Sequence, residues 1–228
     1  MKATTFTDVR SLEKTTHLRI LKPKKCKICK EVFTPQRPLQ SVCGYKCASE
    51  KARIDREKKE AKEWSKRKSE LKEEIKTLTD WKKDLEKEIN KLVKIIDKGM
   101  NCISCGNSGK EQAGHYHSVG SNGSLRFHLD NIHLQDYYCN VKLSANIIGY
   151  DEGLIRIYGK EYWEKVKFDL VRTYPLCKFD EGKIREAIKE TRAIIRELQK
   201  VDLIYPPKAR LRLRAELNKR IGLYNATT

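Results

Sequence analysis

The sequence predicts a mainly helical α+β protein with a small ββα-metal core stabilised by zinc. Three observations predict this fold class. Cysteines stand in close pairs within residues 26–47 and 102–139, apolar residues recur at seven-residue intervals across 61–96, and glycine and serine interrupt 100–148. Because the chain has 228 residues and an aromatic share of 8%, we expect small folded units rather than one large core.

The formal net charge of the chain is +18. Lysine and arginine replace the counterions along a phosphate backbone, so this surplus favours nucleic acid as the partner. No stretch approaches the roughly 20 apolar residues of a membrane span, and the N-terminus has no apolar signal core. We therefore expect a soluble, intracellular protein with no membrane partner, whose closely paired cysteines bind metal rather than form disulfides.

The N-terminal part divides into a loosely ordered segment, residues 1–22, and a zinc-binding module, residues 23–49. Four thiolates at the module's spacings suit one tetrahedral Zn²⁺, which can fold a segment too short to be stabilised by burial. Four protein ligands leave no open coordination position, so we expect a structural zinc that positions a basic surface on DNA. The expected ligands are Cys26, Cys29, Cys43 and Cys47.

Residues 50–99 predict a long charged helix with a coiled-coil stripe. No glycine or proline interrupts the pattern before Gly99, and at 1.5 Å per residue the part from 61 to 96 would run about 54 Å. Three interpretations stay open: the stripe pairs with a second copy in a homodimer, it packs on the chain's own C-terminal helices, or the segment is simply a charged run in solution. The stripe consists of Trp64, Leu71, Leu78, Leu85 and Leu92, with Ala61, Ile75, Ile89 and Ile96 on the companion seam.

Residues 100–148 predict a β-hairpin followed by a helix, because turn-forming residues separate short apolar segments. We expect this stretch to carry the chemistry of the protein. A connector from Gly149 to Gly159 would follow it.

Residues 149–204 then form a C-terminal helical region, with helices expected at about 160–173 and at 181–201. Asp180 is a plausible N-cap for the second helix, and Pro206 and Pro207 follow its end. Residues 205–228 form a basic tail, either a short helix that tracks phosphates or an ordinary amphipathic helix.

The order of motifs in the core carries a resemblance to a known family. Cys102-Ile-Ser-Cys105, Ala113-Gly-His115-Tyr116, Asn131-Ile-His133 and Cys139-Asn140 closely resemble the NinG (Rap) recombination proteins of lambdoid phages. The core is also similar to the treble-clef-like HNH nucleases, including the phage resolvase endonuclease VII. In layout the likeness extends over residues 26–200, and it is specific only in 102–146.

The resemblance implies an enzyme that hydrolyses phosphodiester bonds in branched recombination intermediates such as Holliday junctions and D-loops. It implies Mg²⁺ or Mn²⁺ as catalytic cofactor, phage or host recombination proteins as partners, and the cytoplasm of a bacterial host as location. A homodimer would suit such a reaction, because resolving a junction requires two nicks.

Phosphodiester hydrolysis needs a base for water and a cation for the charge that develops on the phosphate. His115 stands at the position of the HNH base and is the candidate catalytic residue. Asn131 matches the middle Asn, which ties a loop and orients the base, and Asn140 matches the final metal ligand. Asn146 is an alternative to Asn140, and His117 is a candidate second ligand. Arg126, His133 and Lys142 are the expected DNA contacts.

Two departures from the pattern affect the expected metal sites. Gly114 stands where HNH nucleases commonly have Asp or His, so the missing ligand would come from Glu111, Asp130 or His117. Asp136 replaces a cysteine in the second zinc knuckle. Zinc accepts a carboxylate oxygen, so the expected second site consists of Cys102, Cys105, Asp136 and Cys139.

Two alternative functions remain. Gly114, together with Gln112, keeps open a non-catalytic, zinc-containing DNA-binding or recombination accessory protein whose HNH core has decayed. The other alternative is a sequence-specific HNH endonuclease. Binding driven by phosphate contacts is common to all three functions and does not separate them.

Overall fold

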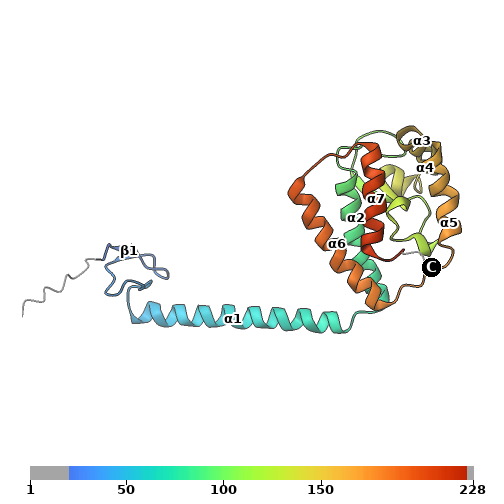
Figure 1. The fold of residues 1–228 in the computed structure, drawn as a ribbon. Helices are drawn as coiled ribbons and strands as arrows, with labels where there is room; N and C mark the ends of the chain where they lie inside the picture. Colours follow the sequence, from blue (N-terminus) through green and yellow to red (C-terminus); the bar gives the residue numbers. More distant parts are fainter. Residues whose placement is uncertain (1–20, 225–228) are drawn as a thin grey trace, which may run out of the picture. The chain divides into compact units, whose positions relative to one another are not determined.

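The computed structural model describes residues 21–224, which form two compact units that divide after Glu74 (Figure 1). The expected loose segment at residues 1–22 lies, up to residue 20, outside the described residues. Within residues 21–224 no helix is long and apolar enough to cross a membrane.

The first unit is a zinc-knuckle-like loop followed by a single helix. Strands β1 (Lys24–Lys25) and β2 (Val32–Phe33) pair antiparallel, and α1 (Tyr45–Glu74) follows them. No residue of α1 is buried. The helix consists mainly of Lys, Glu, Arg and Ala, which favour helix intrinsically, and Arg53 adds ion pairs one turn away on either side.

The expected uninterrupted helix is wrong, because the chain breaks between α1 and α2 (Leu78–Ile96). Thr77 begins α2 with a capping box: its hydroxyl accepts from the amide of Asp80, and the Asp80 carboxylate accepts from the amide of Thr77. Capping satisfies amides that have no partner inside a helix, which favours a new start at this residue. The heptad pattern therefore extends over two helices in two units.

On α2 the apolar stripe packs on helix α6 (Glu181–Val201). For this half of the stripe, the structure confirms packing on the chain's own C-terminal helices. Leu85, Ile89 and Leu92 are fully buried. On α1 the stripe residues Trp64 and Leu71 are exposed. Homodimer formation remains a prediction.

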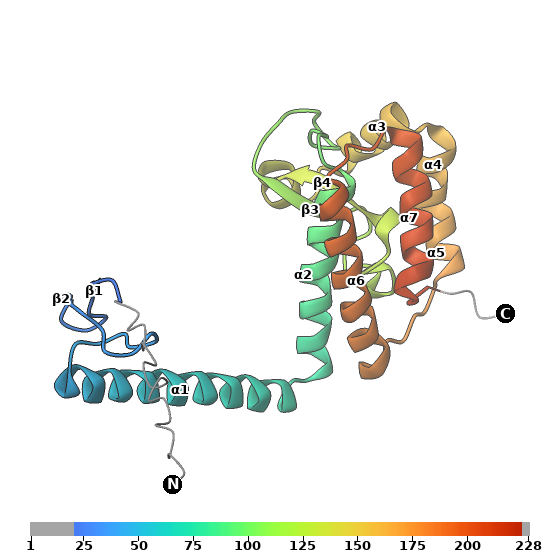
Figure 2. The same cartoon turned by 60° about the vertical axis from the view of Figure 1, so that its left-hand side comes forward.

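The second unit is built around an antiparallel hairpin of β3 (Glu111–His115) and β4 (Ile132–Asp136), which confirms the expected hairpin. The 3-10 turns η1 (Gly123–Leu125) and η2 (Leu129–Asn131) lie in the connection between the strands. Figure 2 shows β3 and β4 beside the C-terminal end of α2.

The helix expected after the hairpin is the short π-helical segment η3 (Tyr138–Lys142). It is followed by α3 (Ile147–Tyr158). The element that follows the two strands is therefore a short π-helix rather than a regular α-helix.

The two faces of the hairpin contact different cores. Ile132 and Ala113 pack in the cluster formed with α2 and α6. Tyr116 belongs to the cluster with Ile103 and Tyr150, which lies beneath α3. Since alternate residues of a strand point to opposite faces, residues 113 and 115 face α2, whereas 112 and 114 face α3.

The expected connector at 149–159 is wrong, because α3 covers it up to Tyr158. Gly153 does not break this helix. A Cβ at Gly153 would overlap the carbonyl oxygen of Ile103, so glycine permits α3 to lie directly on the backbone of the Cys102–Cys105 knuckle. Glycine in this helix is therefore explained by close packing rather than by a turn.

Gly153→Ala is expected to destabilise the protein by about 2–3 kcal/mol, because α3 or the knuckle must move away to make room for the methyl group. Thermal or urea unfolding of the full chain measures this change. Gly123→Ala is the matched control, since a Cβ added at this glycine would meet no atom within 4 Å. Equal stability of the two variants would contradict the packing argument.

The remaining helices cover the hairpin from the C-terminal side. Residues 160–173 are helical as expected, in three segments: α4 (Lys160–Glu164), η4 (Lys165–Asp169) and α5 (Leu170–Thr173). Helix α6 confirms the second expected helix. Its N-cap is Asp180, whose carboxylate accepts from the amide of Lys183.

Helix α7 (Pro207–Ile221) forms most of the expected basic tail, and it is a packed helix rather than a free phosphate-tracking one. Arg210 and Arg214 are buried. The Arg214 guanidinium donates to both carboxylate oxygens of Asp97, at 2.8 and 2.7 Å, and to the carbonyls of Leu129 and Ile132. These arginines therefore hold the fold together and are not available to DNA.

Candidate functional site

The first cysteine cluster has the geometry of a zinc site. The ligand atoms of Cys26, Cys29, Cys43 and Cys47 all lie within 4.8 Å of one another. Cys43 Sγ lies 3.5 Å from Cys29 Sγ and 3.6 Å from Cys47 Sγ. A tetrahedral zinc with Zn–S bonds of about 2.3 Å separates its sulfurs by about 3.8 Å, so the four thiols fit one ion.

Within this cluster the pKa of Cys26 is lowered, whereas neighbouring thiols and burial raise the pKa of Cys43 and of Cys47, so Cys26 is the thiol that loses its proton first among these three. Burial raises the pKa of its thiol, but backbone N–H groups, including that of Cys43 at 3.4 Å from Sγ, lower it overall to about 6. A thiolate is the form of cysteine that binds zinc. This cluster needs no ligand from outside the first unit.

The second cluster joins the start and the end of the hairpin. Cys102 and Cys105 precede β3, Asp136 ends β4, and Cys139 lies in η3, with their ligand atoms within 4.8 Å of one another. Asp136 Oδ2 lies 3.1 Å from Cys105 Sγ, and Asp136 Oδ1 accepts from the amide of Cys139 at 3.0 Å. The carboxylate therefore takes the place of a fourth thiolate.

Asp136 is deprotonated in the ordinary pH range. Burial raises the pKa of its carboxyl, but the Cys139 amide and the neighbouring thiols lower it overall to about 2. Three sulfurs and one carboxylate oxygen form a closed tetrahedral donor set for zinc. Both predicted ligand sets are thus brought together, and each fits a structural zinc ion.

Asp136→Ala is expected to reduce the zinc content from about two ions to about one per chain, because the second donor set loses its fourth ligand. Metal analysis after dialysis against a moderate chelator measures this loss. Asp169→Ala removes an exposed carboxylate outside both clusters and should keep both ions. Two ions retained in Asp136→Ala would show that Asp136 is not a ligand.

His115 is the last residue of β3 and is half-buried on the α2-facing side. Its Nε2 lies 2.9 Å from the carbonyl oxygen of Arg126. A carbonyl only accepts, so Nε2 must carry the proton and Nδ1 is left as a bare acceptor. Burial, as the largest influence, lowers the pKa of His115 below its ordinary value of 6.5, so the ring is neutral at pH 7.

A charged pair accompanies His115. The Arg126 guanidinium binds the carboxylate of Glu86, on α2, at 2.6 Å, and Arg126 Nε is buried with no hydrogen-bond partner among the described residues. Sequence reasoning missed Glu86, because it lies in a charged helix 29 positions before His115. The signal in the sequence is that Glu86 directly follows Leu85, a residue of the apolar stripe that turns out to be buried.

Asn131 is fully buried and holds the connection between the strands. Its Oδ1 accepts from the amide of His117 at 2.8 Å, and its Nδ2 donates to the carbonyls of His117 and Leu125. These bonds fix the backbone that follows His115. Asn131 can therefore act on the site only as a positioning residue.

The expected metal ligands beside His115 are not gathered there. Asn140 donates to Gln112 at 2.7 Å, on the opposite side of β3 from His115. Asn146 lies 3.5 Å from Cys139 Sγ, and His117 Nε2 lies 2.9 Å from the carbonyl of Val166. These residues do not form a ready site for Mg²⁺ or Mn²⁺.

The proposed substitutes for the missing ligand are also placed elsewhere. The Asp130 carboxylate is buried and binds Lys165 at 2.8 Å and Tyr162 at 3.2 Å. Glu111 is exposed at the start of β3. A Cβ at Gly114 would overlap the side-chain oxygen of Gln135, so the usual ligand position is already filled.

One of the three expected DNA contacts is wrong. His133 is fully buried, and its two ring nitrogens lie 3.0 and 3.2 Å from the hydroxyls of Tyr150 and Tyr162. Arg126 is one-fifth exposed beside Glu86. Lys142 is exposed, with its amine 6.0 Å from the ring centre of Tyr137, so it remains a predicted contact.

Comparison with known proteins gives one consistent family. Residues 19–202 match the family model described as NinG, Bacteriophage Lambda NinG protein. The chain is 32% identical over 188 residues to protein ninG of Escherichia phage 933W, covering 74% of this chain and 94% of that protein. It is 31% identical over 117 residues to protein ninG of Escherichia phage lambda, covering 49% and 57%. No solved structure matches the chain.

Proposed function

The chain belongs to the NinG family of bacteriophage proteins, and we propose that it is an endonuclease that cuts branched DNA such as Holliday junctions and D-loops. The observation that carries the proposal is the orientation of His115 by the Arg126 carbonyl. This arrangement provides a neutral imidazole whose Nδ1 carries no proton, beside the guanidinium of Arg126. Phosphodiester hydrolysis needs such a base and a cation for the phosphate.

In the proposed reaction, Nδ1 of His115 takes a proton from the attacking water while Nε2 keeps its bond to the carbonyl. Arg126, which is one-fifth exposed, holds a non-bridging phosphate oxygen with the terminal N–H groups that Glu86 does not occupy. Asn131 keeps the strand connection in place through His117. The leaving oxygen takes its proton from solvent.

The net charge of +18 supports binding to the phosphate backbone, which all recombination substrates share. Residues of α1 contribute to that surface, since this helix is rich in lysine and none of its residues is buried. Pairing of two α1 helices through Trp64 and Leu71 would supply the two active sites that junction resolution requires. The expected setting is the cytoplasm of the phage's host, together with other recombination proteins.

A second candidate, a DNA-binding accessory protein without catalysis, is favoured by a different observation. Asn140 is bonded to Gln112 and the space at Gly114 is filled by Gln135, so the metal ligands of an HNH site are not in place. In this alternative, the two zinc sites and the basic surface bind branched DNA for another enzyme.

One experiment separates the two candidate functions. The purified full-length protein is incubated with a four-way junction or with a linear duplex of the same arm sequences, with Mg²⁺, with Mn²⁺ or with neither. The nuclease nicks the junction in preference to the duplex, and only with added metal, which the substrate phosphates would have to help bind because the expected ligands are not gathered beside His115. Tight junction binding without nicking under all three conditions would exclude the nuclease and support the accessory protein.

A further inference from the structure

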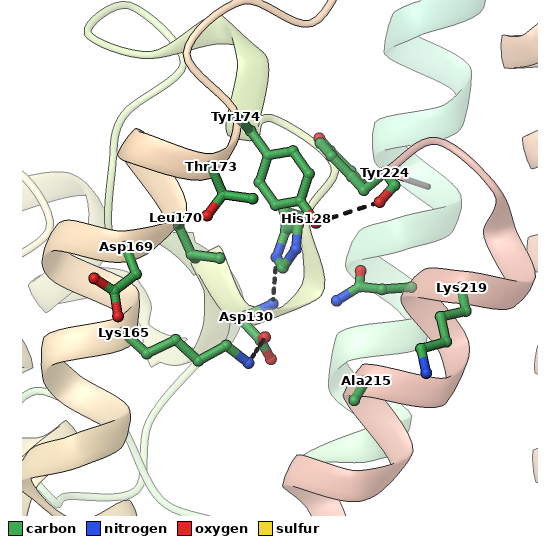
Figure 3. A pocket seen from close by; sticks show the side chains of 11 residues that line it. His128, Asp130, Lys165, Asp169, Leu170, Thr173, Tyr174, Ala215, Lys219 and Tyr224 are labelled. Carbon is green, nitrogen blue, oxygen red and sulfur yellow. Dashed lines mark hydrogen bonds and ion pairs between the residues drawn. The ribbon is translucent and has the colours of Figure 1, made fainter. Parts of the chain in front are cut away.

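A cavity of about 560 Å³ opens on the second unit, away from both zinc clusters and from His115, none of which lines it. Its walls come from η2, from the η4–α5 segment and from α7 with the residues after it (Figure 3). The size lies within the range of roughly 300–1,000 Å³ that is typical of small-ligand sites.

Three aromatic rings form one wall of the cavity. The ring centres of Tyr174 and Tyr224 are 5.2 Å apart at 70°, and His128 lies 4.7 Å from Tyr224 and 5.3 Å from Tyr174. Leu170 adds an apolar side chain. A wall of this kind suits a flat aromatic ligand, because stacking needs ring faces and exclusion of water.

Two side-chain donors within the cavity lining have no acceptor among residues 21–224. His128 is 4% exposed, and its Nδ1 accepts from the amide of Asp130 at 3.2 Å, so the neutral ring carries its proton on Nε2. Asn218 Oδ1 accepts from the amide of Leu129 at 3.0 Å, which leaves the Nδ2 group of this buried residue to donate. Neither donor atom is among the fully buried side-chain atoms that lack a partner, so both are open to the cavity, where the ring nitrogens or carbonyls of a ligand can accept from them.

One unpaired lysine gives the cavity opening a positive charge, because the other charges near the opening are paired. Lys219 is exposed and has no ion-pair partner within residues 21–224. Lys165 neutralises Asp130 at 2.8 Å. Asp169 at the rim lies 3.8 Å from Arg172, which offsets its charge. An anionic group on the ligand would therefore be held at Lys219.

We propose that this cavity binds one unpaired nucleotide of a DNA strand. The base lies against Tyr174 and Tyr224, its acceptors face His128 and Asn218, and its phosphate lies at Lys219. Inorganic phosphate would leave the aromatic wall empty, and a neutral apolar ligand would leave the donors and Lys219 unused. This inference rests on the DNA-binding part of the proposed function and does not require cleavage.

The test uses the full-length zinc-containing protein without added Mg²⁺ or Mn²⁺, so that no nicking occurs. The probe is a duplex with a single unpaired 2-aminopurine, and the control probe carries the same base paired. Stacking should quench the unpaired probe when protein binds. Ala215→Trp fills the cavity from α7 and should weaken binding of the unpaired probe about tenfold, with no effect on the paired one.

Lys219→Gln should weaken binding of the unpaired probe more than Lys208→Gln does, since both lose one exposed charge of α7 but only Lys219 lines the cavity. Thermal unfolding confirms that each variant is folded. Deoxyadenosine monophosphate should bind more weakly than the unpaired probe, and binding as tight as that of the probe would assign the cavity to a free nucleotide and overturn the proposal. Equal binding of both probes, or an Ala215→Trp variant that binds like the parent, would overturn the proposal even if nicking is observed elsewhere.

Discussion

His115→Ala is expected to lower the rate of metal-dependent junction nicking by about 10²–10⁴-fold, the usual contribution of a general base, while junction affinity stays within about twofold. The imidazole donates from Nε2 to the carbonyl of Arg126, which leaves Nδ1 free to take a proton from water. Binding does not need the imidazole, because phosphate contacts by lysine and arginine supply the affinity. Single-turnover nicking and an equilibrium binding assay on the same junction measure the two effects separately.

His117→Ala is the matched control, because it removes the same ring two residues away. His117 binds the carbonyl of Val166 rather than that of Arg126. We expect its nicking rate to change by less than about tenfold, well below the loss from a general base. If His117→Ala abolished nicking and His115→Ala did not, the base would have to be reassigned to His117.

The pH dependence of nicking follows from the lowered pKa of His115. A base works in its deprotonated form, and burial keeps this form populated below pH 6.5, the ordinary pKa of histidine. The rate should therefore stay constant as the pH falls to about 6.5 and decrease only below it. A decline that begins near pH 8 would point to another group.

Arg214→Ala is expected to destabilise the second unit by about 3–5 kcal/mol, because it leaves the Asp97 carboxylate buried without its partner. Both side chains are fully buried. The guanidinium also satisfies the Ile132 carbonyl at 2.7 Å, so one substitution removes bonds between α7, α2 and the start of β4. Urea unfolding of the full chain, followed by near-ultraviolet circular dichroism, measures the loss.

Arg212→Ala removes an exposed arginine from the same helix and should change stability by less than about 0.5 kcal/mol. The double variant Arg214→Ala with Asp97→Ala should be more stable than the sum of the two single changes predicts, because neither charge is then left alone. Stability of Arg214→Ala within about 1 kcal/mol of the parent would show that the pair contributes little.

Cysteine spacing was the most reliable guide to the sites. Together with the family resemblance, which pointed to Asp136, it predicted two sets of four residues whose ligand atoms lie within 4.8 Å of one another, since zinc accepts few ligand types and needs them close together. Local signals also predicted the hairpin and the helix that begins after Asp180, since turns and caps depend on a few adjacent residues. Thr77 and Asp80 form an equally local signal for the start of a helix. The apolar heptad pattern runs unbroken across them, and it therefore predicted one continuous helix.

The sequence by itself determined the two metal clusters, the charge and the family resemblance, because each depends on residue types at short spacing. Only the tertiary structure decided which polar residues are buried. It buried His133 and Arg214, placed Glu86 beside Arg126, and separated Asn140 from His115 across a strand. These outcomes depend on which helix covers which face of the hairpin, and such packing joins residues up to 117 positions apart. Spacing along the chain carries no record of those contacts.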